Sequence, residues 1–424
     1  MGVVSDLLKD VYIPRMLYVR QEFDKACIDK NCISQEVKAR LDAKGMGTAI
    51  KKGADIAITA GSRGISNYKE ILKAIVDYVK EKGGNPFLVP TMGSHGGATA
   101  EGQLMILESA GITEEYMDCP IKSSMETVQI SITPTGVPVF SDKNAQEADG
   151  IIVVNRVKPH TCFRGKYESG IMKMMTIGLG KQKGAEFCHH RGFGHMAEML
   201  EMIGHEVRVH SKILFAMAIL ENAYDETCDL VPLWSDEIES IEPQLLIRAR
   251  ELMPKILIDR ADVLIVDEIG KNYSGDGIDP NITGAFCSPH ASGGLKTQHV
   301  AVLDVSEASH GSTIGMGVAS TGTKRLYDKF DPEKTYPNSL TATTPESSKV
   351  PMIFRNDKEA IQAAIKMSND VDEKTLTVIR IPNSLHIDRI MISESLMEVA
   401  KRTPGMVIES EPEYMSFDEN GNLF

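Results

Sequence analysis

The sequence has few aromatic residues, and this scarcity argues against one broad class of function. Phe, Trp and Tyr together make up 6% of the 424 residues, and Trp234 is the single tryptophan. Proteins that bind single-stranded nucleic acid usually stack the bases on aromatic side chains. The formal net charge of −13 also lacks the basic excess that is typical of nucleic-acid binding. We therefore expect no nucleic-acid partner.

Paired cysteines and long apolar runs are also absent from the sequence. The seven cysteines are an odd number and none lies in a Cys-x-x-Cys pair, so we expect neither a disulfide framework nor a structural zinc site. No apolar run reaches the length of about 20 residues that spans a bilayer. The start, MGVVSDLLKD, has neither the basic nor the apolar region of a signal peptide. These absences predict a cytoplasmic protein without a membrane partner.

Three common site motifs are missing as well. Residues 178–184 (GLGKQKG) resemble a phosphate loop, but no Ser or Thr follows the lysine. The backbone of such a loop could still cradle a phosphate, so a nucleotide-dependent transferase or hydrolase remains an alternative. No HExxH zinc motif is present. Residues 267–284 are rich in Asp, Asn and Gly but do not match a calcium loop, which leaves turn chemistry or one side of a cleft.

Strands and helices alternate along the sequence that remains. Hydrophobic residues make up 42% and charged residues 25%, which suits a globular protein with substantial cores. Apolar runs predict strands, and segments with helical periodicity lie between several of them. The predicted strands are 54–60, 86–89, 150–154, 213–220, 261–270, 298–306 and 375–382, and the predicted helices include 67–82 and 236–253. This alternation predicts an α/β protein with largely parallel sheets.

The chain length suits two domains. We place the N-terminal α/β domain at residues 1–258 and the C-terminal α/β domain at 259–399, with the active site in the cleft between them. The polar tail 400–424 is expected to pack as a strap on the N-terminal domain.

The most informative segment is 155–191, which concentrates positive charge in an acidic chain. It contains eight Lys or Arg residues against two Glu residues. Such a segment could bind a phosphate or carboxylate, although a charged surface loop is an equally good explanation of the charge alone.

Arg63, His95 and His160 each follow a predicted strand, so they would converge at one sheet edge. A single loop histidine more often makes a structural hydrogen bond than it catalyses. Two histidines at adjacent strand ends favour acid–base chemistry.

These segments together resemble the nickel-dependent lactate racemase family of 2-hydroxy-acid racemases and epimerases. The similar segments are GSRG with Arg63, GSHGG with His95, KPH with His160, Ser169-Gly170-x-x-Lys173, and His189. His189 follows Lys173 by sixteen residues, as in the family. The resemblance runs through most of the chain.

The resemblance implies a nickel-pincer nucleotide, a pyridinium mononucleotide whose ring carbon and two sulfurs bind nickel. Lys173 would tether this cofactor through a thioamide, and His189 would be the protein ligand to nickel. His95 and His160 would be the two acid–base catalysts, and Arg63 would hold the substrate carboxylate. The cofactor would do the demanding chemistry while the protein orients the substrate.

The sequence also departs from the lactate enzymes. The spacing from His160 to Lys173 is longer, and Gly284 and Cys287 stand where those enzymes have Gln and Lys. Residues 324–351 resemble the branch that contains epimerases of sugar acids. We therefore expect a larger hydroxy acid as substrate. The enzymes that synthesise the cofactor would be partners, while homo-oligomerisation and a non-catalytic family member stay open.

Overall fold

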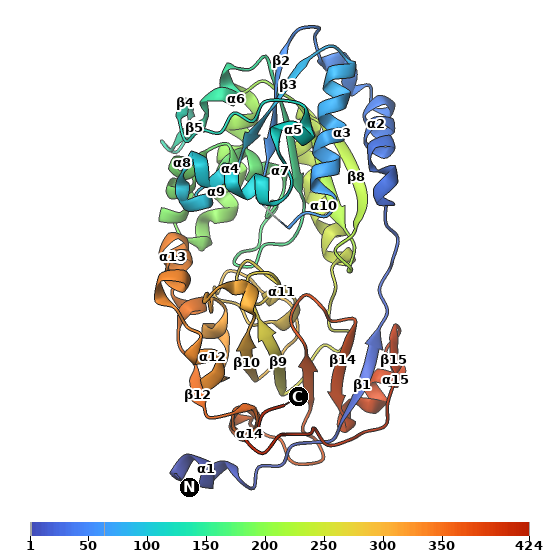
Figure 1. The fold of residues 1–424 in the computed structure, drawn as a ribbon, viewed down its shortest axis with the longest axis vertical. Helices are drawn as coiled ribbons and strands as arrows, with labels where there is room; N and C mark the ends of the chain where they lie inside the picture. Colours follow the sequence, from blue (N-terminus) through green and yellow to red (C-terminus); the bar gives the residue numbers. More distant parts are fainter. Residues whose placement is uncertain (1, 63, 424) are drawn as a thin grey trace. The chain divides into compact units, whose positions relative to one another are not determined.

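The computed structural model describes residues 2–62 and 64–423, which form two compact units. Unit 1 comprises Met1–Phe23 and Pro254–Phe424, and unit 2 comprises Asp24–Met253. Each unit is a mixed α/β structure, as the alternation of strands and helices predicted (Figure 1). Within the described ranges, no helix combines the length and the apolarity that crossing a bilayer requires.

Unit 2 is built on a five-stranded sheet in the order β3-β2-β6-β7-β8, and a separate hairpin pairs β4 with β5. Its strands are β2 (Asp55–Ala60), β3 (Asn85–Pro90), β4 (Thr127–Ile132), β5 (Pro138–Asp142), β6 (Gly150–Arg156), β7 (Ile213–Glu221) and β8 (Thr227–Trp234). Its helices are α2 (Ile33–Ala43), α3 (Tyr68–Glu81), α4 (Ala100–Ser109), α5 (Glu114–Met117), α6 (Lys143–Glu147), α7 (Ile171–Lys173), a π-helical turn (Met174–Gly178), α8 (Lys181–His190), α9 (Phe193–His210) and α10 (Ile238–Leu252). The strands β3, β2, β6 and β7 are parallel, and β8 is antiparallel to β7.

Alternate residues of this sheet enter two separate apolar cores. In β6, Ile151 and Val153 pack with α9 and α10, whereas Ile152 and Val154 pack with α2 and α3. Successive side chains of a strand point to opposite faces, so a strand that is buried on both faces is apolar throughout. The uninterrupted run GIIVV is therefore explained by helices on both faces of the sheet (Figure 1).

Unit 1 is built on an eight-stranded sheet in the order β12-β11-β10-β9-β13-β14-β1-β15. Its strands are β1 (Met16–Gln21), β9 (Val263–Ile269), β10 (His299–Val305), β11 (Thr321–Thr323), β12 (Met352–Phe354), β13 (Val378–Ile381), β14 (Arg389–Ser393) and β15 (Met406–Ile408). Its helices are α1 (Val3–Leu8), α11 (Pro280–Thr283), α12 (Lys324–Asp328), α13 (Pro332–Ala342), α14 (Asp357–Met367) and α15 (Met397–Arg402). The strands from β12 to β13 are parallel, and the other three strands pair antiparallel with their neighbours.

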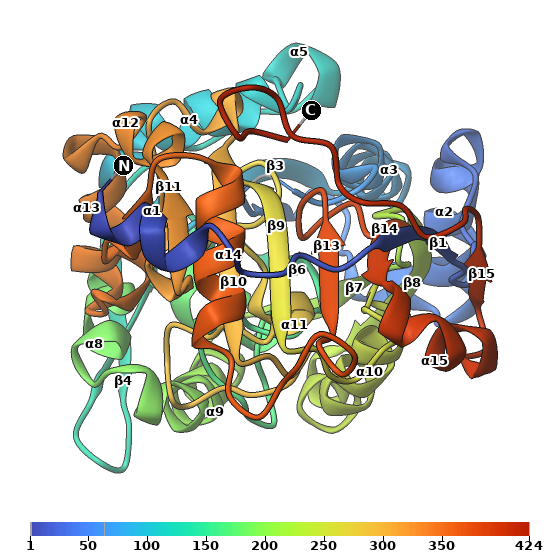
Figure 2. The same cartoon turned by 90° about the horizontal axis from the view of Figure 1, so that it is seen from below.

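The two ends of the chain lie in unit 1, which differs from the expected division. The sequence predicted residues 1–258 as one domain, with the tail 400–424 packed on it. Instead, β1 lies between β14 and β15 (Figure 2), and the amide of Leu423 donates to Asp357 at 2.8 Å. The first 23 residues and the tail therefore belong with the C-terminal segment. The predicted boundary at 258 lies close to the observed one, which follows Met253.

Candidate active site

A cavity of about 210 Å³ opens in unit 2 where β2, β3 and β6 end. Gly61 and Thr91 directly follow β2 and β3, and Asn155 is the penultimate residue of β6. In a parallel sheet the carboxyl ends of neighbouring strands meet at one edge, where ligands bind. The cavity therefore lies at the edge where the sequence predicted the catalytic residues.

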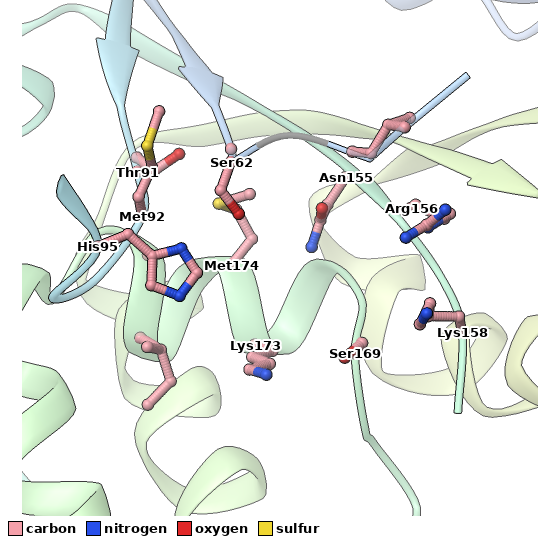
Figure 3. Close-up of a pocket in the computed structure, with 14 residues that line it drawn as sticks. Ser62, Thr91, Met92, His95, Asn155, Arg156, Lys158, Ser169, Lys173 and Met174 are labelled. Carbon is pink, nitrogen blue, oxygen red and sulfur yellow. The ribbon is translucent and has the colours of Figure 1, made fainter. Parts of the chain in front are cut away.

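Polar and charged side chains surround this cavity, above an apolar floor. Met92, Met174 and Ile177 supply the apolar surface. Figure 3 shows His95 on one side of Lys173 and Arg156 with Lys158 on the other. The polar wall consists of Ser62, Thr91, His95, Asn155, Arg156, Lys158, Ser169 and Lys173. Such a wall, with three cationic side chains, suits an anionic ligand.

Arg156 is held in place by an acidic residue of the neighbouring strand. Its guanidinium pairs with Glu221, whose side chain is 8% exposed, and Glu221 also accepts the amide N–H of Ser66 at 2.6 Å. This carboxylate takes up part of the charge of Arg156 and fixes the direction of its side chain at the cavity wall.

Lys173 is the last residue of α7, immediately before the π-helical turn Met174–Gly178. The amide of Leu179 closes this turn by donating to the Met174 carbonyl at 2.9 Å. Such wide turns are rare and are often found at functional sites. Lys173 is thus placed on the cavity wall at an irregularity of the helix.

His160 lies in the loop after β6 and is half-buried. Burial lowers the pKa of His160 well below its usual value, and the positive charges of Lys173 and Lys158 lower it further. Its Nδ1 accepts the amide N–H of Cys162 at 3.0 Å. In the neutral ring this contact places the proton on Nε2, so Nε2 acts as a donor in this arrangement.

His189 lies near the end of α8 and is coupled to the same group of residues. The pKa of His189 is lowered to about 4, chiefly by burial and further by the positive charge of Lys173 and by His95. The Phe193 ring lies 6.1 Å from the His189 ring and 6.1 Å from the His160 ring, measured between centroids. His189 is half-buried, whereas the adjacent His190 is exposed.

The structure thus brings together four of the five residues that the sequence singled out. The pKa of His160 is lowered by Lys173 and His189, and the pKa of His189 is lowered by Lys173 and His95. Arg63 lies outside the described residues. His95 is positioned from α4, where the buried amide of Gln103 donates to the carbonyl of Gly93 at 3.0 Å and to that of His95 at 3.3 Å.

A buried carboxylate that the sequence reading passed over fixes the loop of His160. Glu168 has no exposed side-chain surface, and it accepts the amide N–H of His160 at 2.7 Å. It also accepts the amide of Gly165 at 3.2 Å and pairs with Arg250 of α10. Nothing in the sequence identifies this role, because Glu168 is simply one of two acidic residues in a basic segment.

Glu168→Gln is expected to lower the free energy of unfolding by roughly 2–4 kcal/mol, because a buried ion pair and charge-assisted hydrogen bonds are lost together. Denaturant titration would measure this change. Glu201→Gln is the matched control, since Glu201 is 53% exposed and pairs with the exposed Lys166. That change is expected to cost less than about 1 kcal/mol. Equal effects of the two substitutions would contradict the anchoring role of Glu168.

The run 178–184 does not form a phosphate loop. It consists of the end of the π-helical turn and the start of α8. Lys181 is fully buried, where it pairs with Asp142 at 3.1 Å and donates to the carbonyl of Pro90. Burial lowers the pKa of Lys181, which the nearby Asp142 opposes. The ammonium group of this lysine is therefore unavailable to a phosphate.

The loop 267–284 of unit 1 shows the turn chemistry that its composition suggested. Asp279 caps α11 by accepting the amide of Asn281 at 2.9 Å. Asn272 accepts the hydroxyl of Ser306 at 2.5 Å, which ties the loop to the end of β10. These contacts explain the Asp and Asn content of this loop by local structure.

Comparisons with known proteins support the fold and leave the activity open. A family model described as a domain of unknown function (DUF362) matches residues 56–233, within unit 2. No curated protein matches the chain.

Solved structures give the clearer comparison. The lactate racemase apoprotein from Thermoanaerobacterium thermosaccharolyticum is similar at a TM-score of 0.52 and 13% identity, covering 84% of this chain and 92% of that one. The chain has a lactate racemase-like fold. A Thermotoga maritima protein from structural genomics is similar at a TM-score of 0.45 and 11% identity, covering 66% of this chain and 72% of that one.

Proposed function

We propose that the protein is a racemase or epimerase of 2-hydroxy acids that works with a lysine-tethered nickel-pincer nucleotide. The main support is that His95 and Lys173 line one cation-rich cavity, while His160 and His189 are both coupled electrostatically to Lys173. The lactate racemase-like fold gives this grouping its chemical context. A substrate larger than lactate remains a prediction, as does the role of unit 1 in completing a cleft.

The residues at the cavity fit the proposed cofactor in the chemistry of their donors. Lys173 supplies a primary amine, which a thioamide tether requires. His189 supplies an imidazole, a good ligand for nickel, and its lowered pKa keeps the ring neutral and able to bind metal at neutral pH. Arg156, Lys158 and Ser62 supply the charge and hydroxyl group that a nucleotide phosphate would require.

When bound, the nickel-pincer nucleotide supplies a reversible hydride acceptor. The residues of this chain manage the proton and the orientation of the substrate. A 2-hydroxy acid that loses its hydroxyl proton and its α-hydrogen becomes a planar 2-keto acid, to which hydrogen can return on either face. His95 and His160 would exchange the hydroxyl proton on the two sides of the substrate, which requires the Nδ1 atom of His160 to release the amide of Cys162 when this ring takes up the proton. Arg63 would hold the substrate carboxylate.

Nickel content tests the assignment of the metal ligand. His189→Ala is expected to lower the nickel retained by the cofactor-loaded protein by at least about tenfold, because the protein ligand to the metal is lost. His190→Ala is the matched control, since the adjacent residue is exposed and is expected to leave nickel unchanged. Metal analysis after co-expression with cofactor-synthesis enzymes gives the result. Loss of nickel only in the His190 variant would contradict the assignment.

A nucleotide-dependent transferase or hydrolase is the alternative function that the basic segment 155–191 suggests. The burial of Lys181 weakens it, because the most P-loop-like lysine pairs with Asp142. That reading requires ATP or GTP together with Mg²⁺, whereas the proposed racemase requires neither.

A further inference from the structure

Glu242 of α10 is buried against the first turn of the helix that carries Lys173. Glu242 is 1% exposed, and its Oε2 atom accepts the amide N–H of Met172 at 2.9 Å. The amide of Ile171 also lies close enough to lower the pKa of this carboxyl. Free N–H groups at the start of a helix are stabilised by an acceptor, which usually comes from the preceding residue. Here the acceptor comes from a helix about seventy residues later in the chain.

Gly170 allows this approach. A Cβ atom at position 170 would lie 2.0 Å from Oε1 of Glu242, a distance that no side chain could accept. The carbonyl of Gly170 accepts the Nδ2 group of Asn155 at 2.8 Å, and Asn155 lines the cavity. The backbone before Lys173 is therefore held from two sides, by Asn155 at the carbonyl of Gly170 and by Glu242 at the amide of Met172.

Burying the carboxyl of Glu242 destabilises the fold, because its hydrogen bonds replace only part of the lost hydration. Oε1 of Glu242 is buried and has no hydrogen-bond partner among the described residues. Burial raises the pKa of Glu242 to about 8, although the amides of Met172 and Ile171 lower it. A leucine would fill a similar volume without desolvating a polar group. Packing alone therefore gives no reason for a carboxyl here, whereas accepting the amide of Met172 does.

The direction of Lys173 depends on this anchor. The π-helical turn begins at Met174, so the hydrogen-bond register changes immediately after the lysine. Successive residues of a helix point in different directions, so a shift of one residue would turn the amine away from the cavity. A fixed first turn of α7 sets the hydrogen-bond register of the residues that precede Lys173, and therefore the direction of its side chain.

We infer that Glu242 is a positioning residue for Lys173. The carboxyl of Glu242 sets the first turn of α7 and so directs the amine of Lys173 into the cavity. The inference rests on the proposed role of Lys173, but its test needs no cofactor. Trace acetylation of the purified cofactor-free chain, followed by peptide mass spectrometry over a range of pH, measures the reactivity and the pKa of the Lys173 amine. Hydrogen exchange measures the protection of the amides of α7.

Three variants of α10 separate positioning from general stability. Glu242→Leu removes the acceptor and is expected to raise exchange at Met172 by about tenfold, the effect of losing one hydrogen bond. It is also expected to shift the acetylation pKa of Lys173. Glu242→Gln keeps an acceptor oxygen and is expected to restore both readouts towards wild type. Glu251→Leu is the control, because Glu251 lies exposed on the same helix.

A second route displaces the same carboxyl if the Glu242→Leu chain does not fold. Gly170→Ala places a methyl group against Oε1 and is expected to give the same changes at Met172 and Lys173. Wild-type acetylation of Lys173 in whichever of these two variants folds would overturn the inference. A wild-type protein that takes up no cofactor would contradict the proposed function and would leave these measurements on the free amine valid.

Discussion

Wild-type protein made together with cofactor-synthesis enzymes is expected to carry the mass of the chain plus one cofactor, and the Lys173→Ala protein the mass of the chain alone. The tether requires a primary amine on the cavity wall, which Lys173 provides. The alanine variant is therefore expected to lose racemase activity to the background level, because the hydride acceptor is no longer retained. Intact-mass analysis and a racemisation assay measure the two effects.

Lys183→Ala is the control for the tether. Lys183 lies exposed on α8, ten residues beyond Lys173, and outside the cavity wall. Its substitution is expected to leave both mass addition and activity unchanged. An active wild-type protein in which Lys173 is unmodified would count decisively against the proposed function.

Removal of either proposed catalytic histidine is expected to cost about 10²–10⁴-fold in rate, the usual contribution of a general acid–base group. His95→Ala and His160→Ala should each slow the reaction in both directions, because the equilibrium between two stereoisomers does not depend on the enzyme. The assay would follow cofactor-loaded protein with hydroxy acids from lactate to sugar acids, starting from each stereoisomer.

His195→Ala is the matched histidine control. His195 lies in the first turn of α9 with its side chain 58% exposed, outside the cavity wall, and its loss is expected to leave the rate unchanged. Wild-type rates on the best substrate in both the His95→Ala and the His160→Ala proteins would show that the acid–base residues have been assigned wrongly.

The local pattern of the sequence predicted the strands that are buried on both faces. The predicted runs 150–154 and 213–220 correspond to β6 and β7, since such strands are apolar throughout and end in polar loops. The same reasoning placed His95 and His160 at strand ends, because parallel strands share an edge. Neither step needs knowledge of distant contacts.

The features that the sequence did not predict depend on distant contacts. The strand β1 pairs with β14, which lies more than 360 residues later in the chain, and no local periodicity identifies such a partner. Glu242 and Glu168 look like ordinary charges of a helix and a loop until tertiary packing buries them. Lys181 looks like a phosphate ligand until Asp142 and the carbonyl of Pro90 enclose it.

The place of β1 gives the chain an order of assembly. Unit 2 is one uninterrupted stretch, so a ribosome completes it while the later strands of unit 1 are still unmade. Leu17 and Val19 are fully buried in the finished sheet, yet their neighbours in β14 and β15 are synthesised last. The apolar strand β1 is therefore synthesised long before the strands that bury it. Shortening the chain at its start would consequently damage the sheet that is completed last, rather than the unit that carries the cavity.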